Sequence, residues 1–574
     1  MRSSARDTIN HFQKLLFSKP IGRVKAIFLY STIIVFYGNF VAIKRFVVEN
    51  FHTYKTFFAL QYSLSGIIII IGLTSTILFV FSFNRKLMKG LALFFAFGSG
   101  LYCYFIYRFD IYMNSRIFDS TVGANPDEVW SVIDFWFIPY VLFFSVIPCI
   151  LIFKFQLKKE PKQGGKKVNF YKKLFYIYRY AAVLGAMAII ALLVCYRSFQ
   201  TKYFDNIRLQ AFPVFFFYPS QTLLNGYGHF NCMVNGICSE REKLRDYPNN
   251  FVYNKKNQKE PLIAIFVVGE SLRSDRLSVN GYTRKTTPWM DEAVKTKNLA
   301  VFKDVRACDN YTMGSMPCML SATTIKEWHS EDRKLMKALF SPITHMGWDT
   351  YFYAIQRLPV IDNYIKHFAD TKHYETNSDL AAQDNISGFY MDKYVIPHLK
   401  TDVKENTLYV IHHRGNHKPY NMEYDIKNPA EAPFGTASES DLYDNSTLAF
   451  DGFMRDLAER FKNKNAFIFY ISDHGDSFGE MNPKTGKRAY FHGLLMPDKS
   501  PDEQMNVPLI IWGSDKFIAS NQKLFNHMKS LAKSRDVLEL THDTVFHSFL
   551  DCLDISSPMI DKEMSLCSGF KKFV

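Results

Sequence analysis

A threonine that lies between two cysteines is the first feature of this sequence with a potential for chemistry. In the stretch ACDNYTMGSMPC (307–318), Thr312 follows Cys308 by four places, and Cys318 comes ten places after Cys308. A threonine hydroxyl is a poor nucleophile at neutral pH, but coordination to a divalent cation lowers its pKa. We interpret Thr312 as a candidate nucleophile, although most threonines of this kind are cap or turn residues.

The residues around Thr312 predict a short helix through 311–321, with Asp309 or Asn310 as its N-cap. Such a helix places Thr312 in the first turn. Backbone N–H groups and the helix dipole favour an anion at this end. The candidate nucleophile therefore lies where negative charge is stabilised.

A carboxylate and an Asp-His pair follow two short apolar runs. The run LIAIFVV (262–268) leads into Glu270, and AFIFYI (466–471) leads through a serine into Asp473 and His474. Ligands of open α/β sheets bind at the carboxyl ends of the strands. Carboxylate oxygen and imidazole nitrogen suit Zn²⁺, and the threonine hydroxyl is the further ligand needed. Taken singly, the Asp-His pair is equally compatible with a helix cap and a loop histidine.

The region from about residue 260 has the pattern of an α/β sandwich. Short, uniformly apolar runs alternate with longer amphipathic segments such as 445–463, which predicts a helix. Runs of this kind suit strands covered on both faces, so we expect a largely parallel sheet. Besides the two runs above, the predicted strands are 350–355, 407–411 and 507–512.

The first third of the chain has the composition of a membrane domain. Aromatic residues make up 16% of the 574 residues, with 54 Phe, which favours lipid contact. Apolar runs long enough to cross roughly 30 Å of hydrocarbon predict five helical spans. These spans lie near 25–44, 57–83, 90–107, 134–153 and 177–196. We expect a transmembrane domain over 1–202, an interfacial and linker segment over 203–259, and a soluble domain over 260–574.

The distribution of charge predicts the orientation of these spans. Lysine and arginine are concentrated in the N-terminal tail, the 84–89 turn and the 154–173 loop, whereas the 108–133 connection is acidic. The positive-inside rule places the basic segments in the cytoplasm, and an odd number of spans places the soluble domain outside. The net charge of +15 is then explained by membrane orientation, and we expect no nucleic-acid partner. The first apolar run is interpreted as a retained anchor, because no small-residue cleavage site follows it.

Six of the nine cysteines fall in the exterior portion, an even number in an oxidising compartment. Proximity suggests three disulfides, although six cysteines allow fifteen connectivities. A bridge between Cys308 and Cys318 would restrain the loop that carries Thr312. A thiol metal site is disfavoured because no CxxC spacing is present. The suggested pairs are Cys232–Cys238, Cys308–Cys318 and Cys552–Cys567.

Six segments of the sequence contain most of these candidate residues. They are VVGESLRSDRLSVNGYTRKTTP (267–288), CDNYTMGSMPCMLS (308–321), HHRGNHKPY (412–420), ISDHGDSFGE (471–480), YFHGLLMPDKSPDEQMNVPLIIW (490–512) and THDTVFHSFLDCLDI (541–555). Together they resemble the signature segments of the bacterial phosphoethanolamine transferases that modify lipid A and related envelope glycans, and the spacing of the two cysteines around the threonine is especially specific. The resemblance covers essentially the full length and implies a catalytic domain of the alkaline phosphatase/sulfatase type, with an α/β/α fold, after five spans.

The resemblance implies roles for six residues. His417 and His492 match histidines that contact the phosphoryl group or a second metal ion, although each alone is an ordinary loop histidine. Thr312 matches the nucleophile. The residues that match zinc ligands are Glu270, Thr312, Asp473 and His474. One zinc ion is implied, and a second is left open.

The implied activity is transfer of phosphoethanolamine from phosphatidylethanolamine to lipid A through a phospho-threonine intermediate. The implied location is the bacterial inner membrane, with several spans and a periplasmic catalytic domain, and such a modification of lipid A is associated with polymyxin resistance. One departure concerns YFYAIQRLPVIDNYIKHF (351–368), which has no cysteine where relatives of the lipid A type often carry a pair. Core oligosaccharide or another envelope glycan therefore stays open as the acceptor.

Three alternatives stand beside this interpretation. A glycerophosphate transferase would share the spans and the threonine, but the GNH, YFHG and paired-cysteine segments fit the phosphoethanolamine group better. A sulfatase or phosphatase would share the fold, but Thr312 is followed by Met-Gly-Ser and not by the sulfatase Cys/Ser-x-Pro-x-Arg pattern. A transporter or scaffold would need ionisable residues in mid-span, and the only conspicuous case, Arg179, lies near the edge of the fifth predicted span.

Overall fold

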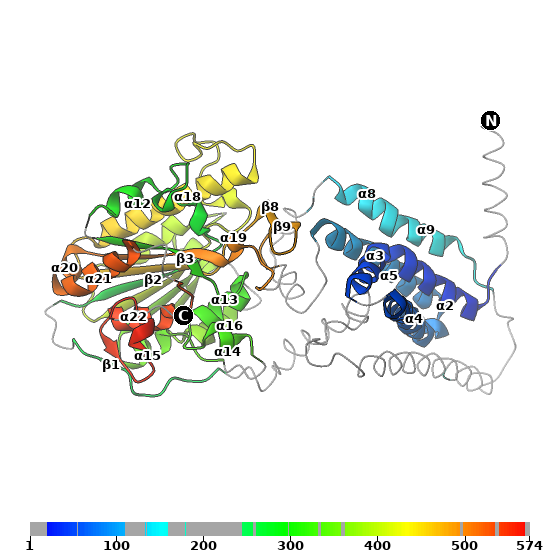
Figure 1. Cartoon of the computed structure of the whole chain (residues 1–574), viewed down its shortest axis with the longest axis horizontal. Helices are drawn as coiled ribbons and strands as arrows, with labels where there is room; N and C mark the ends of the chain where they lie inside the picture. Colours follow the sequence, from blue (N-terminus) through cyan, green and yellow to red (C-terminus); the bar gives the residue numbers. More distant parts are fainter. Residues whose placement is uncertain are drawn as a thin grey trace. The chain divides into compact units, whose positions relative to one another are not determined.

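The computed structural model describes most of the chain in two compact units, one on each side of the segment from 179 to 243. Figure 1 shows a helical N-terminal unit and a larger unit built on a central sheet. The described residues are 20–53, 56–109, 133, 135–158, 178, 244–255, 260–296, 298–330, 335–356, 362–387, 389–493, 497–533 and 539–568.

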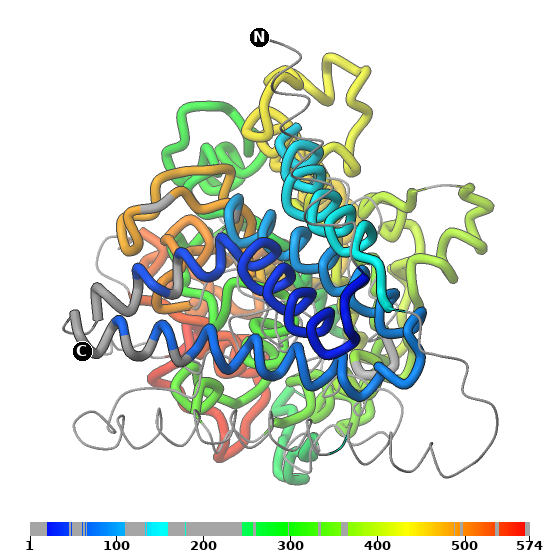
Figure 2. Tube along the Cα trace, turned by 90° about the vertical axis from the view of Figure 1, so that its right-hand side faces the viewer, coloured from blue at the N-terminus to red at the C-terminus, as the bar shows by residue number. Residues whose placement is uncertain are grey.

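The first unit is a bundle of apolar helices. Helix α4 packs beside α2 and α3, and α5 packs against the continuous helical stretch from α8 to α9 (Figure 2). Short π-helical stretches, Ile33–Gly38 and Leu142–Val146, lie within this unit. The helix bounds are α2 Arg23–Thr32, α3 Phe40–Thr53, α4 Thr56–Val80, α5 Arg85–Phe109, α8 Phe137–Val141 and α9 Ile147–Lys154.

Three stretches of the described helices are long and apolar enough to cross a membrane. They are Gly66–Phe83, Arg85–Arg108 and Phe137–Lys154, and they fall on the second, third and fourth predicted spans. The first predicted span is helical but interrupted at Asn39, whose Nδ2 donates to the Ile34 carbonyl at 3.1 Å. The fifth predicted span lies outside the described residues apart from Tyr178, so a total of five spans stays a prediction.

The second unit contains a seven-stranded sheet with the order β3-β10-β7-β2-β6-β4-β5. Strand β2 pairs in parallel with β6 and β7, and β4 pairs in parallel with β5 and β6. Strand β10 runs antiparallel to both of its neighbours. The bounds are β2 Ile263–Gly269, β3 Leu299–Arg306, β4 Asp349–Ala354, β5 His373–Thr376, β6 Thr407–His412, β7 Ala466–Ser472 and β10 Asn506–Gly513.

All five predicted apolar runs form strands of this sheet, and four of its six pairings are parallel, as expected for a largely parallel sheet. Two strands were not predicted. Strand β3 has an apolar first half and a charged second half, and the edge strand β5 is short and polar, with the sequence HYET. Neither has the uniformly apolar composition of a strand covered on both faces.

Helices cover both faces of the sheet (Figure 1). Alternate residues of β2 explain this arrangement, because Phe266 and its alternate neighbours enter one hydrophobic core while Ile265 and its neighbours enter the other. The helices on the Phe266 face are α13 Thr312–Met319, α15 Phe340–His345, α16 Asp362–Ala369 and α22 Thr544–Cys552. The helices on the Ile265 face are α12 Pro288–Ala293 and α18 Glu439–Phe461.

Helix α18 begins six residues before the start of the predicted helix 445–463 and ends two residues before the end of that predicted helix. Ser438 and Asp441 form a capping box at its start, which the apolar pattern alone did not indicate.

The second unit also contains shorter helices and two small sheets of two strands each. The α-helices are α14 Ile325–Trp328, α17 Asn377–Gln383, α19 Asp502–Met505, α20 Asp515–Ser520 and α21 Gln522–Lys533. In the small sheets, β1 Val252–Tyr253 pairs with β11 Ile555–Ser556, and β8 Phe478–Asn482 pairs with β9 Lys487–Tyr490.

The end of the predicted linker belongs to the second unit. Tyr247, Phe251 and Tyr253 are buried in the core on the α22 side of the sheet. Tyr247 stacks on Phe546 of α22 with the ring centroids 5.6 Å apart. Residues 244–255 thus pack within the second unit through aromatic side chains. The sequence did not indicate this packing, because polar residues surround these aromatic residues.

The close approach of β2 and β7 generates a stability prediction. Gly269 is the last residue of β2, and a Cβ added there would lie 2.2 Å from the hydroxyl of the buried Tyr470. We expect Gly269→Ala to lower the free energy of unfolding by about 1–3 kcal/mol through overpacking. Thermal unfolding of the full chain in detergent measures the change.

The matched control is Gly452→Ala inside α18, where the nearest atom to an added Cβ is a terminal nitrogen of Arg455 at 4.0 Å. Alanine favours helix, so this variant should be more stable by about 0.5–1 kcal/mol. An unchanged melting temperature for Gly269→Ala would contradict the packing account.

Candidate active site

The sheet brings the residues after β2 and β7 together. Gly269 and Ser472 are paired at the carboxyl ends of these neighbouring parallel strands. Glu270 follows the first strand directly, and Asp473 and His474 follow the second. Each of these three side chains is fully buried. The predicted meeting of carboxylates and imidazole at this edge is present in the structure.

Thr312 is the first residue of α13 and lies at the same place. The N-cap residue is Tyr311, without a side-chain hydrogen bond, so the predicted capping by Asp309 or Asn310 is wrong. The carboxylate of Asp309 instead accepts from the Asn310 amide at 2.8 Å. Thr312 is nevertheless in the first turn, as predicted, and the end of the helix directs backbone N–H groups toward this region.

Four side chains converge within hydrogen-bonding range. The Thr312 hydroxyl donates to Glu270 Oε2 at 2.9 Å and lies 3.4 Å from His474 Nε2. The same Nε2 lies 3.5 Å from Glu270 Oε1 and 3.3 Å from Asp473 Oδ2. All four predicted ligands are therefore brought to one point.

This donor set fits a divalent cation. No residue in the described part of the chain donates a hydrogen bond to the buried Asp473 Oδ2, which is costly for a carboxylate oxygen unless something else binds it. One ligand atom from each of Glu270, Asp473 and His474 lies within 4.8 Å of the others. The Nδ1 of His474 lies 2.8 Å from the Gly475 carbonyl, so Nδ1 carries the proton and the Nε2 lone pair faces the cluster. Two carboxylates, an imidazole and a hydroxyl suit Zn²⁺.

The electrostatics of the cluster also favour a cation. Burial raises the pKa of Asp473 well above its usual range, and the charge of Glu270 adds to this effect. Burial opposes ionisation of Glu270 as well, but His474, His417 and His492 outweigh it and lower the pKa of Glu270. Burial and His492 lower the pKa of His474 to about 4, so its imidazole is neutral at pH 7. A bound cation would allow both carboxylates to ionise.

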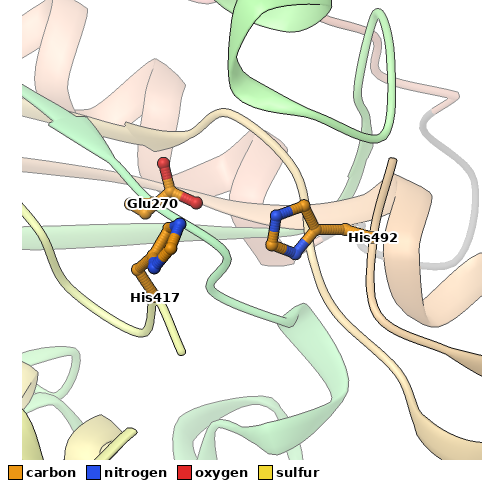
Figure 3. A group of neighbouring side chains, drawn as sticks. All are labelled: Glu270, His417 and His492. Carbon is orange, nitrogen blue, oxygen red and sulfur yellow. The ribbon is translucent and has the colours of Figure 1, made fainter. Parts of the chain in front are cut away.

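His417 and His492 lie beside Glu270, as Figure 3 shows. One ligand atom of each histidine and one carboxylate oxygen of Glu270 lie within 4.8 Å of one another. The ring centroid of His492 is 4.3 Å from that of His474 and 5.8 Å from that of His417. The structure thus places both predicted substrate-binding histidines beside the cluster, where their side chains are half-buried.

Separate groups orient these two histidines. Nδ1 of His417 donates to the Lys418 carbonyl at 2.7 Å, which fixes the orientation of the ring. The buried Asp476 places Oδ1 3.3 Å from His492 Nδ1 and accepts the Tyr420 hydroxyl at 2.6 Å. Burial opposes ionisation of Asp476, but His492 and Tyr420 prevail and lower its pKa to about 2. Asp476 is therefore a permanent negative charge behind His492.

Two buried residues that the sequence did not single out hold the loops of the site, and Asp392 is the first. It accepts from the backbone amides of Arg414 and Gly415, each at 2.8 Å, and from His413 Nδ1 at 3.0 Å. Asp392 therefore fixes the turn that leads to His417. No signal in the sequence indicated this, because Asp392 lies in a 3₁₀-helical segment far from the turn in sequence.

His542 is the second such residue. Its Nδ1 accepts from the Cys308 amide at 3.1 Å, and its Nε2 donates to the Ser472 carbonyl at 3.0 Å. Burial lowers the pKa of His542 to about 3, so the ring stays neutral and keeps both bonds. The THDTV segment was part of the resemblance, which gave a signal for this histidine but no role.

The disulfide next to Thr312 restrains the loop and the helix. Cys308 is bonded to Cys318 with the Cα atoms 6.2 Å apart, and Cys552 is bonded to Cys567. These are two of the pairs that proximity suggested. The third suggested pair, Cys232–Cys238, lies outside the described residues. Because Cys318 lies in the last turn of α13, the bridge ties that turn to the loop before Thr312.

Comparisons with known proteins agree with this geometry. A family model described as Sulfatase matches residues 263–555, which is more than half of the chain. The chain belongs to the sulfatase family. A second model, described as Phosphoethanolamine transferase EptA/EptB, matches residues 71–225 of this sulfatase-family chain. The predicted sulfatase-type α/β domain is therefore confirmed.

Curated relatives of this sulfatase-family protein are phosphoethanolamine transferases. The Kdo(2)-lipid A phosphoethanolamine 7''-transferase of Salmonella typhimurium is 24% identical over 543 residues, covering 89% of this chain and 91% of that protein. Phosphoethanolamine transferase EptA of Helicobacter pylori is 22% identical over 576 residues, covering 96% and 97%. The similarity extends over both units.

A solved structure shows the same fold. The integral membrane protein lipooligosaccharide phosphoethanolamine transferase A of Neisseria meningitidis superimposes with a TM-score of 0.71 at 19% identity, covering 96% of this chain and 100% of that one. The arrangement of a membrane domain followed by a sulfatase-type domain is thus shared with a solved membrane protein.

Metal content tests the cluster directly. We expect the purified full chain to retain a divalent cation, and we expect Asp473→Asn and Glu270→Gln to weaken its binding by roughly 100-fold or more, since loss of a group that merely supports a ligand already weakens binding 10–100-fold. Elemental analysis by mass spectrometry after dialysis measures the bound zinc. Asp451→Asn is the matched control, because Asp451 is also a buried carboxylate but accepts from the backbone amides of Trp289 and Met290. Wild-type zinc content in Asp473→Asn would refute the site.

Proposed function

We propose that this chain transfers phosphoethanolamine from phosphatidylethanolamine to lipid A, or to another lipopolysaccharide group, on the periplasmic side of the bacterial inner membrane. The observation that carries the proposal is the Thr312 hydroxyl, 2.9 Å from Glu270 Oε2 at the start of α13. The names of the relatives support the donor and the class of acceptor.

In the first half-reaction, Thr312 Oγ1 attacks the phosphorus of the donor. Glu270 Oε2 accepts the hydroxyl proton across the 2.9 Å bond. The bond from Oγ1 to phosphorus forms, and the bond from phosphorus to the diacylglycerol oxygen breaks. That oxygen takes up the proton that Glu270 received, and diacylglycerol leaves. A divalent cation held by Glu270, Thr312, Asp473 and His474 would lower the pKa of the hydroxyl and offset charge on the phosphoryl group. Backbone N–H groups at the start of α13 also face that charge.

In the second half-reaction, an acceptor oxygen attacks the phosphorus bound to Thr312. The bond between phosphorus and Oγ1 breaks, and Oγ1 takes up the proton that the acceptor releases to a neighbouring histidine. His417 or His492 receives the acceptor proton, since each places a ring nitrogen beside Glu270. Asp476 behind His492 stabilises that ring when it is cationic, which favours His492 as the base.

The membrane unit fits this chemistry, because the donor and the proposed acceptor are both lipids. Three described helices are long and apolar enough to cross a bilayer. Addition of phosphoethanolamine brings an ammonium group to lipid A and reduces its net negative charge. Cationic polymyxins would then bind it less strongly.

The alternative is a glycerophosphate transferase or a phosphatase of the same superfamily. A phosphatase would use the same threonine but pass the phosphoryl group to water. The relatives named as phosphoethanolamine transferases favour the first proposal over both, since they match nearly the whole chain.

Thr312 variants test the intermediate. Thr312→Ala should abolish transfer, whereas Thr312→Ser keeps the oxygen, gains rotamer freedom and should retain part of the activity. Incubation of the wild-type chain with phosphatidylethanolamine should release diacylglycerol in an amount equal to the enzyme and leave a phosphoethanolamine adduct on the Thr312 peptide. Intact-protein mass spectrometry with peptide mapping detects the adduct. Full activity in Thr312→Ala would exclude this nucleophile.

The acceptor is tested in cells. Mass spectrometry of lipid A and of core oligosaccharide, with the wild-type gene, with Thr312→Ala and without the gene, should show one added phosphoethanolamine only with the wild type. Addition to the core sugar would move the acceptor there. Addition of glycerophosphate would establish the alternative.

A further inference from the structure

A buried glutamine behind the cluster contacts three separate segments of the site. Gln504 lies in the four-residue helix α19, immediately before β10, and its side chain is 1% exposed. It reaches the loop before Thr312, the segment after His474 and the residue before His492. None of these segments adjoins it in sequence.

The first contact holds the nucleophile loop. Gln504 Oε1 accepts from Asn310 Nδ2 at 3.1 Å, and Asn310 lies two residues before Thr312. The same Nδ2 donates to Ser500 Oγ at 2.9 Å. The neighbouring Met505 adds a backbone bond to this loop, because its carbonyl accepts from the Ala307 amide at 2.7 Å.

The second contact holds the loop of His492. Gln504 Nε2 donates to the Phe491 carbonyl at 2.6 Å and to Ser477 Oγ at 3.0 Å. Phe491 directly precedes His492 and has a φ of 58°, a left-handed conformation that is uncommon for a bulky residue. The bond to its carbonyl therefore supports a backbone conformation that the sequence alone does not favour.

The third contact joins the metal-ligand loop through the backbone. The Gly475 amide donates to the Gln504 carbonyl at 2.9 Å, one residue after His474. The approach is close, since a Cβ at Gly475 would lie 2.1 Å from the Glu503 carbonyl oxygen. Gln504 is thus bonded to the three loops that carry Thr312, His474 and His492.

We infer that Gln504 is a positioning residue that fixes the distance between the side chains of the nucleophile Thr312 and of His492 at the value that the reaction requires. A carboxamide offers an acceptor and two donors on one rigid plane, and here the acceptor serves one loop while the donors serve the other. The inference rests on the proposed function, because it assigns both loops to one reaction. Gln504 acts through Asn310 and Phe491.

Gln504→Met tests the inference, because methionine is similar in size and lacks both hydrogen-bonding functions. We expect kcat for transfer to fall roughly 10- to 100-fold, the loss associated with a displacement of about 1 Å. The fall in kcat should exceed any rise in the KM for phosphatidylethanolamine, and the zinc content should stay at the wild-type value, since the side-chain contacts described for Gln504 include none of the four candidate ligands. A wild-type kcat would overturn the inference, and loss of zinc would assign Gln504 to metal binding instead.

Gln504→Glu supplies a readout that a purely structural role would not give. The introduced carboxyl group would repel the Phe491 carbonyl when it is ionised and would donate a hydrogen bond to it when it is protonated. The ratio of variant to wild-type kcat should therefore rise as the pH falls from about 8 to about 5, since burial raises the pKa of a carboxyl into this window. The titratable groups near these contacts include Glu503, whose Oε1 lies 3.4 Å from Ser477 Oγ, Asp476 directly before Ser477, His492 directly after Phe491, and Lys484, which donates to the Ser500 carbonyl. All of them are present in the wild type. A ratio independent of pH would count against the inference.

Asn445→Leu is the matched control. Asn445 is another buried amide, and it bonds to the backbone of Phe434 and Gly435 outside the site. This variant should lose stability without the pH-dependent ratio. If the wild-type chain released no diacylglycerol from phosphatidylethanolamine, the proposed function would fail. If the wild-type chain released diacylglycerol and Gln504→Met had the same kcat as the wild type, only the inference about Gln504 would fail.

Discussion

The burial of two carboxylates beside one imidazole is the constraint on which the rest of the site depends. Glu270 and Asp473 are both inaccessible to solvent and share the neighbourhood of His474 Nε2. In a medium of low polarity, two such groups repel each other when both are ionised. Ionisation of both carboxylates therefore requires compensating positive charge, which a divalent cation held by these side chains would supply beside the N-terminal amides of α13. The hydroxyl of Thr312 lies at the same point, so a cation that offsets the charge of the carboxylates would also lower the pKa of this hydroxyl.

The rigid frame around the cluster is a second consequence of this constraint. Repelling groups would separate if their loops were free to move. Here the loops are held from outside by buried polar residues, among them Asp392 and His542, and by the disulfide between Cys308 and Cys318. Each of these two polar residues uses nearly all of its hydrogen-bonding capacity on groups of a loop, which suits a role in geometry more than one in chemistry.

Much of the site could be predicted because its reactive residues follow directly after apolar strands. Glu270 and Asp473 were found in this way, and the carboxyl ends of parallel strands then placed them together without further information. Thr312 was found from its spacing to the cysteines. The supporting residues could not be predicted, because Asp392, His542 and Gln504 acquire their roles from contacts with distant segments of the chain. The direction of β10 was also hidden, since an apolar run looks the same in either orientation, and the N-cap of α13 was misassigned because two polar residues before Thr312 bond to other partners.

The antiparallel direction of β10 determines which end of this strand lies at the edge of the sheet that carries the site. Parallel strands bring their last residues to the catalytic edge, whereas β10, which lies next to β7, begins at that edge. The segment between β7 and β10, from Asp473 to Met505, is therefore topologically one long hairpin connection, although it contains ligands, histidines and the small β8–β9 sheet. Both of its ends are fixed by neighbouring strands of the same sheet. Insertions or deletions within such a connection leave the register of the strands unchanged, so the length of the β8–β9 hairpin can vary without disturbing the core of the sheet.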